Sequence, residues 1–331
     1  MHVEKLNRRR AITILAGTAA ALSFENLLAP AQANDEYEWQ GLAMGTDARI
    51  IFRNAEKAAL QAALVAVFDE IERLERALSL FRNDSEIVRL NHESVLRSPS
   101  LDMRRSLQLA LSIADMTNGL FDPTVQALWE AHVDWFATGA ATVPPEDIIR
   151  AARSTVSWQK IELAANSIRL GSGQRITLNG LGQGYVTDRV AELLRAHGFS
   201  RVLVDLGEQR ALGRPQTGTA WHIARSDAVP FELSDGALAT SEGAGCIFGA
   251  GDAAHHLFDP RTGRSASHWR RVTVHHSSAA VADSLSTALY AATAEEIATI
   301  VSKFRGLVVW AIGCDNMEHR WIAPPVHGVS I

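Results

Sequence analysis

The sequence predicts an α+β fold, with mixed sheets flanked by helices. Apolar residues recur at helical spacing in several segments, whereas other short segments are almost continuously apolar. The two kinds follow one another without the regular alternation that indicates a parallel βαβ sheet. Apolar residues make up 47% of the chain, which is enough for a large core. We therefore expect one large domain or two closely packed halves.

Residues 1–33 are predicted to be an export signal. Three consecutive arginines precede a modestly apolar run over 11–28, and the small-x-small pattern of a cleavage site follows at 31–33. The arginines favour the twin-arginine route to the periplasm. A membrane anchor is the alternative, but Glu25 and Asn26 interrupt a run already shorter than the roughly 20 apolar residues of a spanning helix. The expected organisation is a signal peptide over 1–33 and a single domain over 34–331.

The net charge limits the kinds of binding partner, and the cysteine content limits the role of disulfides in the fold. The formal net charge is −5 and becomes more negative without the cationic leader, which argues against nucleic acid or an anionic membrane as partner. Cys246 and Cys314 are too few for a disulfide framework, although one bridge between them stays open.

The elements follow from periodicity, caps and breakers. In the first half they are a strand over 47–52, a helix capped by Asn54 that runs to Leu78, a helix capped by Asp102 that runs to Met116 and ends at Asn118-Gly119, and a loop with a short helix over 129–145. In the second half they are a hairpin over 161–170, a helix over 184–197 ended by Gly198, strands over 201–206 and 272–276, helices over 279–292 and 294–304, and a buried strand over 307–312.

The segment HHLFDPRTG, His255–Gly263, collects several residue types that carry chemistry. Neighbouring side chains of an extended segment point to opposite faces, so at most one of His255 and His256 is expected to enter a site. Asp259-Pro260 predicts a turn with a cation, a hydroxyl and backbone donors at its tip. Taken alone, the segment fits a structural histidine better than a catalytic one.

A helix of small residues over 278–289 carries Asp283 and Thr287 four residues apart, on one face. A carboxylate and a hydroxyl in this arrangement suit a hard cation such as Mg²⁺. The alternative is an ordinary polar pair facing solvent. The alanine-rich surroundings favour a buried location, because small residues let a helix pack closely.

The segment ITLNGLGQGYVTD, over 176–188, has glycines at 180, 182 and 184 and is expected to form a turn before a helix. Such a turn exposes backbone amides and carbonyls to a phosphate or a metal. Its spacing matches neither the dinucleotide motif nor the P-loop. A second corner, GLFDPT over 119–124, brings an aromatic ring and a carboxylate to a helix end.

In this order, the motifs resemble the ApbE family of FAD-dependent protein FMN transferases along nearly the whole domain. The leader and the segments over 178–188 and 203–213 are most similar to the NosX-like subgroup, which is associated with maturation of nitrous oxide reduction systems. The matching segments are Met44-Gly45-Thr46, LSLFRNDSEIVRLN over 78–91, GLFDPTV over 119–125, LNGLGQGYVTD over 178–188, LVDLGEQRALG over 203–213, ALATS over 237–241, HLFDPRTG over 256–263, and the helix with Asp283 and Thr287.

The resemblance implies that family's fold, with an FAD cleft between two packed halves, and a set of site residues. His256 falls on the family's histidine beside the scissile diphosphate. Asp283 and Thr287 fall on Mg²⁺ ligands, with the main-chain carbonyl of Gly180 as a third. The residues that fall at FAD-binding positions are Met44, Phe81, Leu120, Phe121, Asp122, Thr177, Gln183 and Phe258.

Three positions depart from the family pattern. Thr177 stands where aspartate is usual, Gln183 where a charged residue, often lysine, is usual, and Phe81 where tyrosine is usual. The loss of charge near the diphosphate is expected to lower FAD affinity or turnover.

The resemblance implies Mg²⁺-dependent transfer of FMN from FAD to a Thr or Ser hydroxyl of an exported or membrane-anchored redox protein, with release of AMP. Two related hypotheses stay open: a protein that only binds FAD, as carrier or assembly factor, and an FAD diphosphatase in which water replaces the hydroxyl. A copper or zinc site at His255/His256 and His275/His276 is disfavoured, because adjacent residues on a strand chelate poorly.

Overall fold

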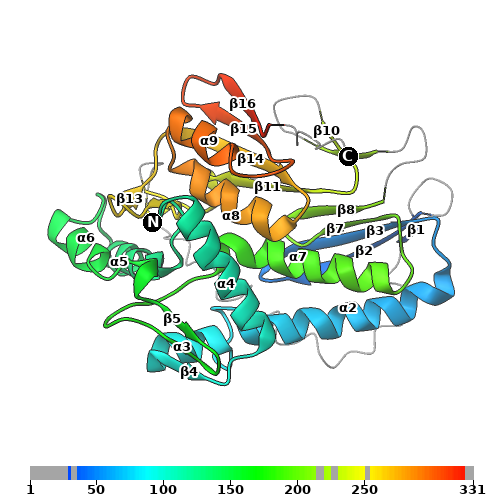
Figure 1. Ribbon diagram of the computed structural model, residues 1–331, viewed down its shortest axis with the longest axis horizontal. Helices are drawn as coiled ribbons and strands as arrows, with labels where there is room; N and C mark the ends of the chain where they lie inside the picture. Colours follow the sequence, from blue (N-terminus) through cyan, green and yellow to red (C-terminus); the bar gives the residue numbers. More distant parts are fainter. Residues whose placement is uncertain (1–28, 31–35, 214–219, 225–229, 250–253, 325–331) are drawn as a thin grey trace, which may run out of the picture.

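The computed structural model describes residues 29–30, 36–213, 220–224, 230–249 and 254–324. Across this part of the chain, the centre of the molecule is a nine-stranded sheet in which every pairing is antiparallel (Figure 1). In their order across the sheet, the strands are β1 (Ala29–Pro30), β2 (Glu36–Ala43), β3 (Thr46–Arg53), β7 (Val202–Asp205), β8 (Gln209–Leu212), β11 (Ala237–Glu242), β14 (Trp269–His276), β15 (Val308–Gly313) and β16 (Glu318–Ile322).

Helices cover one face of this sheet and a short hairpin covers the other. Side chains of β7 alternate between the faces: Val202 and Val204 join the main core on the helix side, whereas Leu203 packs with Trp221 of the hairpin. This mixture of helices and antiparallel sheet confirms the α+β class. The covering helices are α2 (Lys57–Leu78), α7 (Asn179–Ala196), α8 (Ala279–Tyr290) and α9 (Ala294–Val301), with α4 (Leu101–Met116) packed across α7 and α8, and the hairpin strands are β9 (Trp221–Ile223) and β10 (Phe231–Leu233).

A three-stranded sheet lies to one side of these layers, at the lower left of Figure 1. Its order is β4 (Val95–Arg97), β6 (Ser167–Arg169), β5 (Glu162–Ala164), and α3 (Glu86–Glu93) lies beside β4. The predicted hairpin over 161–170 is confirmed as β5 and β6. The remaining described elements are η2 (Pro123–Val125), α5 (Gln126–Ala137), α6 (Glu146–Arg153), η3 (Trp158–Lys160), η4 (Gly243–Gly245), β12 (Phe258–Asp259) and β13 (Arg264–Ser265).

Two predicted helix caps were wrong. Asn54 takes a left-handed conformation, with a φ of 54°, in the turn before α2, and Glu56 is the N-cap of that helix. Asp102 lies inside α4, where Ser100 is the N-cap and accepts the N–H of Met103 at 3.2 Å. Asp102 is instead buried. Asn54 therefore belongs to the turn before α2, and Asp102 belongs to the first turn of α4.

The prediction of a loop with a short helix over 129–145 was wrong in its first half. Helix α5 occupies Gln126–Ala137, and the loop begins only at Thr138. Leu128 and His132 are buried four residues apart, as the inward face of a helix requires. The prolines that suggested irregular structure follow the helix.

The predicted signal peptide lies outside the described residues, apart from 29–30 in β1. Within the described chain, no helix is long and apolar enough to cross a membrane. Cys246 and Cys314 are both free thiols, so they form no bridge with each other.

Candidate active site

The glycine-rich segment forms the first turns of α7, and not the turn before a helix that its sequence suggested. Gly184 lies against α8, because a Cβ added to it would come within 2.3 Å of the carbonyl oxygen of Ala279. Only a residue without a side chain permits this approach of two backbones. The glycine therefore lets α7 and α8 cross in close contact.

The crossing buries an acidic side chain. Asp283 is 4% exposed and accepts the backbone N–H of Gly184 at 3.0 Å. Glu208 is also buried. Burial raises the pKa of Asp283 to about 7, and burial together with the nearby charge of Asp283 holds the pKa of Glu208 well above its ordinary value. Neither group has a salt bridge among the described residues, so a cation would stabilise both.

The three predicted Mg²⁺ ligands meet at the same crossing. A Cβ added to Gly180 would lie 3.1 Å from Oγ1 of Thr287 and 3.2 Å from the ring of Phe121. Thr287 lies one turn after Asp283 in α8. The carboxylate, the hydroxyl and the Gly180 backbone thus provide hard oxygen donors beside uncompensated negative charge, a combination that fits Mg²⁺.

Asp188, which sequence reasoning missed, fixes the start of α8. Its carboxylate accepts the N–H groups of Ala279 and Ala280 at 2.9 and 3.0 Å and the hydroxyl of Ser278 at 2.6 Å. A carboxylate at this position satisfies otherwise free helix N–H groups. Arg210 lies 3.6 Å from the same carboxylate. The signal in the sequence was the last residue of the motif over 178–188.

The surroundings of His255 and His256 differ. His255 is buried, with Nε2 donating to the carbonyl of Ala266 at 2.9 Å and Nδ1 accepting the N–H of Leu257 at 3.3 Å. Nδ1 of His256 lies 3.2 Å from the carbonyl of Cys246. A carbonyl only accepts, so Nδ1 carries the hydrogen and Nε2 keeps a lone pair. Burial lowers the pKa of His256, which favours the neutral ring at pH 7.

The histidine segment is attached to α8. The ring of His255 packs edge-on against Tyr290, with 5.6 Å between ring centroids, and the Tyr290 hydroxyl accepts the N–H of Gly243 at 3.1 Å. Tyr290 follows Thr287 by three residues. The helix that carries two predicted metal ligands therefore also positions the segment that carries His256.

Met44 and Phe81, both predicted to contact FAD, lie near the start of α7. The Cε of Met44 is 3.6 Å from the position of a Cβ on Gly182, and the ring of Phe81 is 4.0 Å from that of a Cβ on Gly45. Phe81 is 72% exposed. An exposed aromatic ring at this place is available to stack on a flat ligand.

Thr177 and Gln183, two of the three departures from the expected pattern, lie just before α7 and within it. Nε2 of Gln183 lies 3.4 Å from Oγ1 of Thr46, its acceptor. The N–H of Thr177 donates to the carbonyl of Pro123 at 2.8 Å, and its hydroxyl accepts the N–H of Asn179 at 3.1 Å. Both side chains are neutral, so these two positions lack the charges that the resemblance led us to expect.

The corner over 120–122 is largely built into the fold. Leu120 and Phe121 are buried in the main core. The carboxylate of Asp122 accepts N–H groups from Thr124 at 2.8 Å and Trp158 at 3.1 Å, and also the Thr124 hydroxyl at 2.6 Å. Burial raises the pKa of Asp122. The hydrogen bonds of this carboxylate therefore stabilise the conformation of the corner.

Phe258 lies in an aromatic cluster beside α5. Its ring centroid is 4.7 Å from that of His132 and 6.1 Å from that of Phe248. The structure thus shows a packing role for Phe258, while its contact with FAD stays a prediction.

A copper or zinc site finds no support in the described part of the chain. No group of three or more His, Cys, Asp or Glu side chains is placed there to hold a metal. The donors at the α7–α8 crossing are of another kind, since two of the three are a hydroxyl and a main-chain carbonyl.

Comparisons with known proteins identify the family and agree with the overall fold. The model of the ApbE family matches residues 44–310. An FAD:protein FMN transferase of Klebsiella pneumoniae (strain 342) is 28% identical over 306 residues, 86% of each chain, and that of Treponema pallidum (strain Nichols) is 26% identical over 305 residues, 82% of this chain and 83% of the relative. The flavin transferase ApbE from Vibrio cholerae has a TM-score of 0.74 at 22% identity, covering 87% of this chain and 97% of that one. The ApbE protein from Thermotoga maritima has a TM-score of 0.76 at 24% identity, covering 86% and 97%.

Proposed function

The chain belongs to the ApbE family, and from this premise we propose that it is an FAD:protein FMN transferase. The observation that carries the proposal is the α7–α8 crossing, where Asp283, Thr287 and Gly180 meet beside Phe121. The reaction would transfer the FMN part of FAD to a Thr or Ser hydroxyl of a partner protein and release AMP.

Asp283, Thr287 and the carbonyl of Gly180 would hold Mg²⁺ at the crossing. When bound, the cation neutralises diphosphate charge and stabilises AMP as the leaving group. The protein's own contribution is to hold these donors on two helices in close contact, with Asp188 fixing the first turn of α8. A rigid donor set of this kind needs little rearrangement when the substrate arrives.

His256 would act as the general base. Its Nδ1–H donates to the carbonyl of Cys246, which leaves Nε2 to accept the proton of the incoming hydroxyl. The hydroxyl oxygen forms a bond to the phosphorus of the FMN part as the bridging P–O bond to AMP breaks. The product is an FMN phosphoester on the partner protein.

We further propose an exported or membrane-anchored redox protein as acceptor and the periplasm as the compartment. The twin-arginine pattern over 8–33 supports this location. Similarity to the NosX-like subgroup supports an acceptor in nitrous oxide reduction.

The neutral side chains of Thr177 and Gln183 favour a second candidate function, an FAD carrier with little transferase activity. A carrier would leave FAD bound and intact when an acceptor is present. An FAD diphosphatase would release AMP and free FMN without an acceptor.

The test is mass spectrometry of an acceptor flavoprotein domain after incubation with the chain from residue 34, FAD and Mg²⁺. The expected result is a mass gain equal to FMN less water. His256→Ala and Asp283→Ala should show no detectable gain in the incubation time that suffices for the unchanged protein, and an acceptor with its target Thr or Ser replaced by alanine is the matched control. Intact bound FAD with no gain would overturn the transferase in favour of the carrier.

A further inference from the structure

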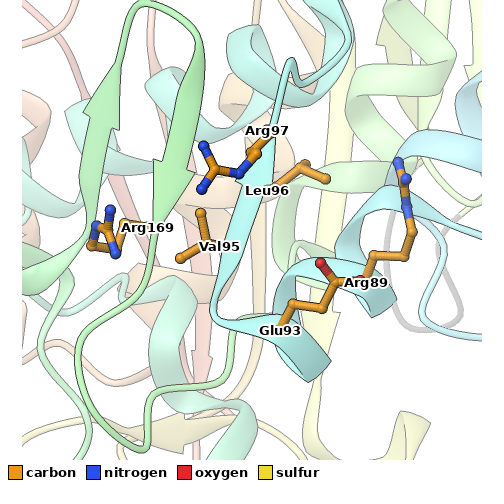
Figure 2. Close-up of a pocket in the computed structure, with 6 residues that line it drawn as sticks. All are labelled: Arg89, Glu93, Val95, Leu96, Arg97 and Arg169. Carbon is orange, nitrogen blue, oxygen red and sulfur yellow. The ribbon is translucent and has the colours of Figure 1, made fainter.

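A cationic pocket lies on the small sheet, apart from the α7–α8 crossing. It has a volume of about 250 Å³ and lies between α3, β4 and β6 (Figure 2). Figure 2 shows Val95 and Arg97 extending from β4 toward the strand that carries Arg169, with Arg89 and Glu93 on α3 at the other side of β4. The lining residues are Arg89, Glu93, Val95, Leu96, Arg97 and Arg169.

Strand register explains why two of the arginines share a face. Val95 pairs directly with Arg169, and Arg97 pairs with Ser167 two residues away, so Arg97 and Arg169 are diagonal neighbours. Leu96 and Ile168 point to the opposite face and are 4% and 0% exposed. The apolar face of the sheet therefore packs on the core, and the cationic face is open.

These charges are largely uncompensated. Among the described residues, Arg89 and Arg97 have no hydrogen-bonded or ion-paired side chain. Arg169 has one ion pair, to Glu162 at 3.5 Å, and both side chains are more than half exposed, at 58% and 73%. Such exposed pairs contribute little. The protein as a whole has a net charge of −5, so this patch has the opposite sign to the molecule.

We propose that this pocket docks acidic side chains of the protein acceptor, an inference that rests on the proposed function because it requires a protein substrate. Guanidinium groups bind carboxylates through paired N–H donors. The volume lies below the roughly 300–1,000 Å³ of small-molecule sites, and it suits one or two side chains. The lining has no aromatic ring on which a nucleotide base could stack.

The pocket is rigidly connected to the crossing. The side chain of Asn91 on α3 donates to the carbonyl of Ile176 at 2.8 Å and accepts its N–H at 2.7 Å. Ile176 lies three residues before α7. An acceptor docked at the pocket is thereby held at a fixed place relative to the transfer site, which raises the effective concentration of its hydroxyl.

The test is fluorescence anisotropy of a fluorescein-labelled hexaglutamate peptide with the whole chain from residue 34 at low salt. The double variant Arg97→Gln/Arg169→Gln should weaken binding about tenfold, as expected for two exposed charge pairs. Arg305→Gln, an exposed arginine after α9, is the matched control and should bind within about twofold of the unchanged protein. Thermal unfolding of each variant checks that the fold is intact.

In the peptide experiment, the docking site would be overturned by equal peptide binding by the double variant, or by displacement of the labelled peptide by ADP as readily as by unlabelled hexaglutamate. With an acceptor that receives FMN, the double variant should raise KM about tenfold and leave kcat unchanged. A fall in kcat with constant KM would contradict docking. Peptide binding needs no catalysis, so arginine-dependent binding without FMN transfer would sink the proposed function alone.

Discussion

The hydrogen bonds of His255 and His256 suit a structural role for the first and the proposed general-base role for the second. We predict that His256→Ala lowers FMN transfer by about 10²–10⁴-fold, the usual contribution of a general base. FAD affinity should change little, since the role proposed for Nε2 of His256 is to accept the proton of the incoming hydroxyl. The measurement is AMP release in a single turnover beside FAD binding by fluorescence.

His255→Ala is the comparison for that experiment. Both ring nitrogens of His255 bond to the backbone, at Ala266 and Leu257, so its loss leaves buried polar groups unpaired. This variant should lower the free energy of unfolding by roughly 1–3 kcal/mol. If His255→Ala kept full stability and His256→Ala kept full activity, the assignment of the two roles would be wrong.

Because the pKa of Asp283 is raised, we predict that the stability of the protein depends on pH when divalent cations are absent. Its pKa in the folded protein is raised to about 7, so folding favours the protonated carboxyl. That stability is fully present below the ordinary carboxyl pKa and is lost as pH rises to about 7. Asp283→Asn keeps an acceptor for Gly184 without the charge, so it should unfold at a higher temperature than the unchanged protein at pH 8 and at a similar temperature near pH 4.

Adding Mg²⁺ at pH 8 should reverse this order, because only the carboxylate gains from the cation. Calorimetry of the unchanged protein and of Asp283→Asn at pH 8, each with and without Mg²⁺, gives the four unfolding temperatures to compare. A stability difference that persisted unchanged from pH 4 to pH 8 would show that the carboxyl does not titrate in this range.

At the residue scale, sequence motifs identified positions better than they identified contacts. Asp283, Thr287 and Gly180 were expected together, and the structure brings them together. Asp188 and Tyr290 escaped notice, because their importance lies in which backbone groups they reach across the fold. Nothing in local spacing indicates such partners.

At the element scale, the contact between α7 and α8 depends on Gly184. We predict that Gly184→Ala destabilises the protein by about 1–3 kcal/mol or more, because the new methyl group meets the Ala279 carbonyl at 2.3 Å. Gly182→Ala is the matched control in the same helix. Its Cβ would meet Met44 at an ordinary 3.6 Å, so the change should be neutral or stabilising by about 0.5–1 kcal/mol. Urea unfolding of both variants measures the difference, and equal destabilisation would contradict the close approach at residue 184.

Helices and strands were predicted well where the apolar periodicity was strong. The N-terminal caps of helices were predicted poorly. The strand over 47–52 and the helices over 279–292 and 294–304 are found close to the predicted bounds. Asn54 and Asp102 have the right side chains for caps, but the turn before α2 and the interior of α4 use them otherwise. Cap preference is worth about 1 kcal/mol, which tertiary contacts readily exceed.

At the scale of the whole molecule, the proposed site links ligand binding to stability. We predict that FAD at 100 times its Kd raises the free energy of unfolding by about 2.7 kcal/mol, and that the gain is smaller when Mg²⁺ is removed. Thermal unfolding across an FAD titration measures this. A melting temperature independent of FAD concentration would mean that the crossing does not bind FAD in the native state.

The order of the nine strands in the sheet could not be predicted from the sequence. β3 pairs with β7, and β8 pairs with β11, across long stretches of intervening chain. Alternating apolar residues indicate that a strand has a buried face, but they do not indicate its neighbour. The fold class and the approximate locations of most helices and several strands follow from local pattern, whereas the pairing of distant strands does not.

The crossing of α7 and α8 joins Gly184 to Ala279, and Met44 from near the start of the chain lies beside it. Loop closure over such separations comes late in folding, because entropy must be lost before the contact forms. A partly synthesised chain that lacks α8 has neither Asp283 nor Thr287, so under the proposed function it would lack two of the three donors that hold the metal beside the nucleotide. If FAD binding to the complete protein quenches flavin fluorescence, the extent of quenching would report the number of fully folded molecules. It would then serve as an optical assay of completed folding.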